Sequence, residues 1–192
     1  MTEVKVLIEG YAKKISTGWK ANSTVTLIIS NGRRMIVDPG CNRNELITSI
    51  KKGGLETSDI DYVLLTHNHP DHAFLSSIFE NADVVDELYI YHGDVINKHD
   101  GTIPDTDVKV IRTPGHKEEH CSFIVPTSEG TYVVAGDVFW WTENQKQEVD
   151  VNKPDNDPEH MDLQKLIKSR KKILEMADWI IPGHGKMFKV EK

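Results

Sequence analysis

Cysteine is scarce in this chain, which contains only Cys41 and Cys121 among its 192 residues. The two lie far apart in the sequence, and neither belongs to a C-x-x-C pair. This pattern excludes a disulfide-stapled framework and argues against a zinc knuckle built from cysteine. We therefore expect a protein of a reducing compartment and predict a cytoplasmic location.

Long hydrophobic runs and an excess of basic residues are also missing. No apolar stretch approaches the roughly 20 residues that cross a bilayer, and residues 1–6 lack a signal-peptide pattern, so no membrane partner is expected. The 23 Lys and Arg residues against 30 Asp and Glu give a net charge of −7. That balance argues against a large nucleic-acid footprint, because phosphate binding is mostly electrostatic, but it allows a local basic patch.

The length predicts one domain that spans residues 1–192. Hydrophobic residues make up 38% of the sequence, enough for a large core. Chains split into several cores only above about 250 residues. The sequence leaves open whether copies of the chain associate as a homo-oligomer.

Strand and helix patterns alternate along the chain, which predicts an α/β fold. Strands are expected at residues 24–29, 34–38, 62–65, 88–91, 108–111, 122–125, 131–134 and 179–181. Asn31-Gly32 and Glu129-Gly130 each indicate a hairpin turn. Helical spacing of apolar residues predicts one helix that ends near Gly53 and another over residues 163–174. The polar stretch 142–158 predicts a long loop, and such loops often border active sites.

Five short segments at or just beyond the predicted strands carry side chains that bind metals or support metal ligands. They are residues 37–40 (VDPG), 67–72 (HNHPDH), 113–116 (TPGH), 135–137 (AGD) and 182–184 (PGH). His67 and His69 are two positions apart, so a locally extended backbone points both imidazoles toward one ion. Pro70 then turns the chain, which allows Asp71 and His72 to reach a second ion. Imidazole and carboxylate together suit zinc, and also iron or manganese.

The other candidate residues have ordinary structural explanations when each is taken singly. His116 follows a Pro-Gly turn, Asp137 is placed to cap the next segment, and Asp38 before Pro39 is typical of a turn. His184 is harder to dismiss, because its flanking glycines let a backbone approach a site closely. A dinuclear site accounts for all of them together, since two ions need a bridging carboxylate and further ligands.

The segment from Thr66 to His72 resembles the HxHxDH signature of the metallo-β-lactamase superfamily. Asp38, His116, Asp137 and His184 fall in the family's order and approximate spacing, so the likeness covers most of the chain.

The resemblance implies a role for each candidate residue. A first metal would be held by His67, His69 and His116. A second would be held by Asp71, His72 and His184. Asp137 would bridge the two, Asp38 would orient a ligand from outside, and Asp71 would also orient the nucleophile.

The resemblance also implies the fold and the chemistry. The fold would be a four-layer αβ/βα sandwich with the metals at one edge between two β-sheets. The expected cofactors are two divalent ions, zinc first, with iron or manganese as alternatives. Such ions lower the pKa of a shared water, so that hydroxide is available near neutral pH to cleave an ester, thioester, lactone or phosphodiester.

Three alternatives share this ligand set. One is an RNA endonuclease of the same fold, and another is an iron-dependent oxidoreductase of the sulfur dioxygenase type. A non-catalytic metal-binding protein is the third, but a complete ligand set argues against it. We expect a small-molecule substrate rather than long RNA, because the loop 142–158 would repel a polyanion beside the site. Its acidic residues are Glu143, Glu148, Asp150, Asp155 and Asp157, opposed by Lys146 and Lys153.

Three residues near these motifs have two interpretations each. Trp140 and Trp141 closely follow Asp137, and they either line a substrate pocket or pack in the core. Many members of the superfamily have threonine after the Pro-Gly-His segment, whereas Lys117 follows here and leads to His120. His120 could donate to a substrate, but we expect an exposed polar histidine.

Overall fold

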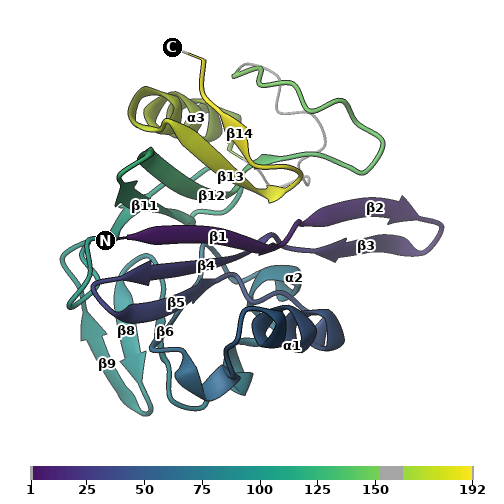
Figure 1. Cartoon of the computed structure of the whole chain (residues 1–192). Helices are drawn as coiled ribbons and strands as arrows, with labels where there is room; N and C mark the ends of the chain where they lie inside the picture. Colours follow the sequence, from purple (N-terminus) through teal and green to yellow (C-terminus); the bar gives the residue numbers. More distant parts are fainter. Residues whose placement is uncertain (1, 152–161, 192) are drawn as a thin grey trace.

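A computed structural model describes residues 2–151 and 162–191, which form two β-sheets, a projecting hairpin and flanking helices (Figure 1). The first sheet has the order β1 (Glu3–Ile8), β4 (Val25–Ser30), β5 (Arg33–Val37), β6 (Tyr62–Leu64), β7 (Asp83–Val85), β8 (Tyr89–His92), β9 (Val95–Lys98). The second has the order β10 (Lys109–Arg112), β11 (Cys121–Thr127), β12 (Gly130–Trp140), β13 (Trp179–His184), β14 (Phe188–Lys189). The hairpin consists of β2 (Tyr11–Ile15) and β3 (Gly18–Asn22). The helices are α1 (Arg43–Lys52), α2 (Pro70–Ala73) and α3 (Leu163–Met176).

Three buried hydrophobic clusters mark the boundaries between four layers. Met35 of the first sheet and Phe123 of the second belong to the cluster between the sheets. Leu46 of α1 belongs to a cluster on the outer face of the first sheet. Leu166 of α3 does the same on the outer face of the second sheet. The order helix, sheet, sheet, helix is the αβ/βα sandwich that the resemblance implied.

Alternation along the strands explains how each sheet buries both faces. In β5, Met35 and Val37 point into the inter-sheet core, whereas Ile36 between them packs toward α1. In β12, Val134 joins the inter-sheet core and Val133 packs toward α3. Successive side chains of a strand point to opposite faces, so a strand buried on both sides must be apolar throughout.

The predicted strands and helices are all present, with some longer than expected. The hairpin turn between β4 and β5 has Asn31 at φ 52° and Gly32 at φ 86°, the left-handed geometry that favours Asn-Gly. Helix α1 ends as predicted, with Gly53 at its C-cap. Strands β1, β2, β3, β7, β9 and β14 were not predicted, and β9 is exposed at every position.

Residues 142–151 of the predicted loop contain neither helix nor strand, and the remainder of that loop lies outside the described residues. Within the described parts of the chain, no helix is both long and apolar enough to span a bilayer.

Candidate metal centre

The predicted ligand segments converge at one edge of the two sheets. Asp38 follows β5 and the 67–72 segment follows β6, and these strands are parallel, so both segments emerge at the same end. Likewise β12 carries Asp137 and the parallel β13 ends at His184. His116, which follows β10, completes the arrangement.

A glycine turns the Asp137 carboxylate toward this edge. The pairing between β12 and β13 shifts register on both sides of Gly136, which has φ 54°. A Cβ at this position would lie 2.6 Å from Thr66 Oγ1 and 2.8 Å from His120 Nε2. Only glycine fits, so the Ala-Gly-Asp sequence determines where the Asp137 carboxylate lies.

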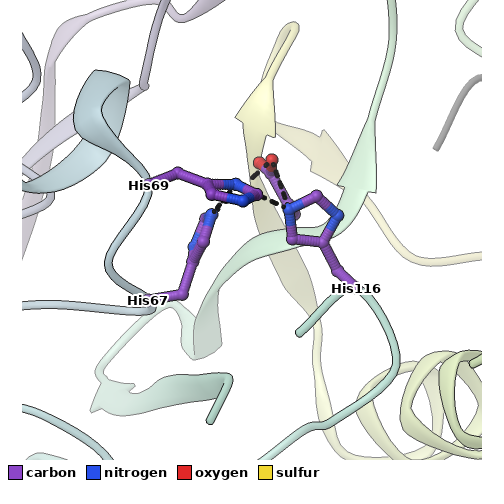
Figure 2. A group of neighbouring side chains, drawn as sticks. His67, His69 and His116 are labelled. Atoms are coloured by element: carbon purple, nitrogen blue, oxygen red, sulfur yellow. Dashed lines mark hydrogen bonds and ion pairs between the residues drawn. The ribbon is translucent and has the colours of Figure 1, made fainter. Parts of the chain in front are cut away.

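The first ligand group consists of His67, His69, His116 and Asp137. Figure 2 shows the three labelled imidazoles converging, with His67 and His69 on one segment of the chain and His116 on another. His69 Nδ1 lies 2.9 Å from His67 Nε2 and 3.0 Å from His116 Nε2. The potential ligand atoms of this group all lie within 4.8 Å of one another, close enough to share one ion.

The second ligand group consists of Asp71, His72 and His184, with its potential ligand atoms within the same 4.8 Å limit. His184 Nε2 lies 3.3 Å from Asp71 Oδ2. Asp137 reaches both groups with different oxygens. Its Oδ2 lies 3.4 Å from His116 Nε2, and its Oδ1 lies 3.2 Å from His72 Nε2 and 3.6 Å from His184 Nε2.

Asp38 lies behind the ligands rather than among them. It is buried, at φ 48°, and its carboxylate accepts hydrogen bonds from Thr66 N at 2.8 Å and Thr66 Oγ1 at 2.7 Å. It also accepts from His72 Nδ1 at 2.8 Å, which leaves His72 Nε2 directed at Asp137. Since Thr66 Oγ1 donates to Asp38, its lone pair is left for His67 Nδ1 at 3.0 Å. One carboxylate therefore orients an imidazole in each ligand group.

Burial and charge give the two groups different protonation. Burial lowers the pKa of His67 well below its ordinary value and that of His69 to about 4. Burial also acts to lower the pKa of His72, but the carboxylates of Asp137 and Asp38 outweigh it and raise that pKa well above normal. Burial acts to raise the pKa of Asp137, but His72 and His184 hold it well below its usual range.

The residues present fit a pair of divalent ions. His72 Nε2 and Asp137 Oδ1 are buried and make no hydrogen bond within residues 2–151 and 162–191, although they lie 3.2 Å apart. Buried polar atoms in proteins are nearly always satisfied, so such a pair indicates a missing partner. Imidazole nitrogens and carboxylate oxygens are donors that zinc and iron accept.

The expectation of an exposed His120 is wrong. This residue is fully buried, and its ring stacks on His67 with centroids 5.1 Å apart. Its Nδ1 lies 3.0 Å from Thr113 Oγ1. Burial lowers the pKa of His120 to about 3, so it is a neutral support behind the first ligand group. The charged residues before it gave no sign of this burial, which arises from the fold.

The two tryptophans after Asp137 are both buried. Trp141 belongs to the core beside α3 and its Nε1 donates to Glu148 O at 3.2 Å. The Trp140 ring meets His184 edge-on at a centroid distance of 5.9 Å and meets Trp19 at 6.1 Å. Trp19 of β3 was not singled out in the sequence, yet its ring contacts Trp140 and the residue is 51% exposed.

Comparison with known proteins agrees with this geometry. Residues 18–104 match the Metallo-beta-lactamase superfamily. Metallo-beta-lactamase domain-containing protein 1 of Xenopus laevis is 34% identical over 98% of this chain and 82% of its own length. An atrochrysone carboxyl ACP thioesterase of Aspergillus fumigatus is 27% identical over 84% of this chain and 50% of its own.

A solved structure supports the same assignment. The crystal structure of a Thermotoga maritima protein described as a metallo-beta-lactamase has a TM-score of 0.73 and 26% identity, covering 98% of this chain and 99% of that chain. The fold, the ligand segments and the relatives agree, and the resemblance seen in the sequence is confirmed. The chain belongs to the metallo-β-lactamase superfamily.

Proposed function

We propose that this chain is a hydrolase that works with two divalent metal ions. The observation that carries the proposal is the position of Asp137, whose two carboxylate oxygens face different ligand groups. Two neighbouring ions need a shared ligand of this kind. The residues that would hold the ions are His67, His69 and His116 for the first, and Asp71, His72 and His184 for the second.

The residues of the chain prepare this site for hydrolysis. Ions bound here would activate a water near neutral pH and polarise a carbonyl or phosphoryl oxygen. The low pKa values of His67 and His69 keep both imidazoles neutral and able to coordinate. The Asp71 carboxylate is ionised, because its hydrogen bond to His184 and the charge of His72 outweigh burial and lower its pKa. As an ionised carboxylate that is half-buried at this edge of the centre, Asp71 would also orient the attacking water.

Substrate approaches from the side of α2. His69 and Asp71, which flank the start of this helix, are half-buried, whereas the remaining ligands are buried. Zinc is the proposed metal, with iron or manganese as alternatives, because mixed imidazole and carboxylate donors suit all three.

The proposed substrate is a small ester, thioester, lactone or phosphodiester. The thioesterase among the relatives supports this class, and the net charge of −7 disfavours long RNA. The loop 142–158 disfavours RNA less than its sequence indicated. Glu143 pairs with Lys13 and Glu148 with Lys146, so part of its negative charge is neutralised.

Metal content tests the dinuclear site. Protein purified without chelator should carry close to two equivalents of metal by elemental analysis. A firm value of one equivalent or less would contradict the shared role of Asp137.

Substrate comparison tests the activity. A panel of chromogenic esters, thioesters, lactones and phosphodiesters should show turnover that the Asp137→Ala variant lacks. Single-stranded RNA, measured at physiological salt, should be cleaved more slowly than the best small substrate. Faster cleavage of RNA would favour the nuclease, and oxygen consumption with bound iron would favour the oxidoreductase.

A further inference from the structure

Three consecutive polar residues are buried at the root of the β2–β3 hairpin. Asn22, Ser23 and Thr24 join β3 to β4, and their exposed fractions are 1%, 0% and 3%. Polar side chains are seldom buried without partners, because each must replace its hydrogen bonds to water. Their partners therefore indicate what this segment holds in place.

The first partners are backbone and ring atoms of the second ligand group and of Asp38. His184 Nδ1 donates to the Asn22 carbonyl at 3.1 Å, which directs His184 Nε2 toward Asp71 and Asp137. Ser23 N donates to the Asp71 carbonyl at 2.9 Å. Ser23 Oγ donates to the carbonyl of Asp38, the residue that orients His72, at 3.0 Å.

The other partners enclose the turn that carries His184. Thr24 donates to the Gly183 carbonyl from both N, at 2.7 Å, and Oγ1, at 3.0 Å. Thr24 Oγ1 also accepts from Gly10 N at 3.0 Å, and the Gly10 carbonyl accepts from Gly185 N at 3.0 Å. A Cβ on Gly10 would lie 2.3 Å from Gly183 O, so the hairpin and this turn approach as closely as backbones can. Both ends of the hairpin are thus bonded to the residues beside His184.

The Asn22 side chain fixes the segment itself. Its Oδ1 accepts from Cys41 N at 2.8 Å and Asn42 N at 3.0 Å, which ties β3 to the chain that follows Asp38. Gly40 leaves room for this contact, since a Cβ there would lie 2.6 Å from Asn22 Oδ1.

We propose that Asn22, Ser23 and Thr24 are positioning residues for the second metal. The contacts to the metal centre end on Asp71, Asp38, His184 and the Gly183 carbonyl, and the others end on Gly10, Cys41 and Asn42. None of the contacts just described ends on His67, His69 or His116. Outer partners of metal ligands typically change metal affinity by about 10- to 100-fold when they are lost. Loss of this segment's bonds should therefore weaken binding of the second metal and leave the affinity for the first unchanged.

The chain offers a matched pair of variants for the test. Thr24→Val removes the hydroxyl that joins Gly10 to Gly183 and keeps the shape of the side chain. Thr26→Val makes the same change two residues along, where the buried hydroxyl makes no hydrogen bond within the described residues. Thr24→Ser restores the hydroxyl. Each protein is stripped with EDTA, checked for its thermal unfolding midpoint, and titrated with Zn²⁺ by calorimetry.

The expected result is a selective loss. Wild type, Thr26→Val and Thr24→Ser should bind two equivalents, while Thr24→Val binds the first normally and the second about 10- to 100-fold more weakly. Ser23→Ala should also weaken binding of the second equivalent, and it serves as the test variant if Thr24→Val fails to fold. Equal weakening of both equivalents, or no change in either, would overturn the inference. The inference rests on the proposed dinuclear site, and wild type that fails to bind two equivalents would instead refute that site.

Discussion

The first ligand group takes two of its imidazoles from the tripeptide His67-Asn68-His69, whereas the second gathers side chains from α2 and from the distant end of β13. The support differs accordingly. The Nδ1 of His67 contacts Thr66 Oγ1 of the neighbouring residue. His184 and the chain around it are instead hydrogen-bonded to the hairpin root, residues 22–24. Each group combines two ligands from residues 67–72 with side chains of distant segments, and the distant ligand of the second group, His184, is held by a bond from the hairpin root.

Protonation sharpens this difference. In the first group the pKa values of His67 and His69 are lowered by burial, whereas in the second group the pKa of His72 is raised by Asp137 and Asp38 despite burial. A metal at the first group displaces no proton from His67 or His69, whereas a metal at the second must displace one from His72. Variants that remove the shared carboxylate, or the outer partner of one group, test this difference.

The largest effect is expected for Asp137→Ala, because this carboxylate faces both groups. Hydrolysis should fall by more than the roughly 100-fold that marks the upper range for outer partners, and metal content should drop toward zero. Elemental analysis and turnover of the best substrate measure both. His120→Gln is the control, since His120 contacts a ligand without being one. Equal losses in two folded variants would contradict the bridging role.

A smaller effect is expected from Asp38→Asn, which keeps the size of the side chain and suits the left-handed backbone at φ 48°. The amide cannot accept from both Thr66 and His72, so both metals should bind about 10- to 100-fold more weakly. Thr66→Val removes the hydroxyl link to His67 and should weaken the first metal while sparing the second. Zn²⁺ titration distinguishes these outcomes. Normal metal binding with reduced thermal stability would mean that Asp38 is only a turn residue.

Most of the centre could be predicted from the sequence, because metal chemistry restricts which residues serve and a short motif fixes their spacing. The seven ligand candidates come together in the structure, and Asp38 lies behind them. The strands predicted from apolar runs are also present, since both faces of the inner strands are buried.

What could not be predicted depends on contacts between distant segments. Asn22 and Ser23 resemble a loop in the sequence and Thr24 begins a predicted strand. Their burial is explained by partners far along the chain, such as Asp71 and Gly183. The same holds for His120, whose charged neighbours suggested exposure. Strands β2 (YAKKI) and β3 (GWKAN) lack the sustained alternation of apolar and polar residues that predicts a strand.

A third prediction concerns stability and pH in the metal-free protein. The folded-state pKa of His120 is about 3, below the ordinary value of 6.5, because burial disfavours the charged ring. Its contribution to stability is present above pH 6.5 and is lost as pH falls toward 3, since the unfolded chain binds a proton that the folded chain refuses. His120→Gln should flatten the fall in unfolding free energy by up to about 1.4 kcal/mol per pH unit. Urea unfolding over this range measures the slope, and parallel curves for variant and wild type would refute the assignment.

The smallest effect is expected for Trp19, which belongs to neither ligand group. Its ring contacts Trp140, and the Trp140 ring lies against His184. We expect the exposed Trp19 ring to contact the apolar part of a substrate bound at the centre. Trp19→Ala should raise KM about two- to tenfold, from the roughly 0.5–1.5 kcal/mol of an aromatic contact, and leave kcat unchanged. Ile15→Ala is a matched control, because Ile15 is 42% exposed on the same hairpin and its pairing with Gly18 places it on the opposite face from Trp19. Assays with esters of increasing acyl length measure the effect, which should grow with the chain. An equal change in both variants would show that the hairpin acts through its fold rather than through the Trp19 ring.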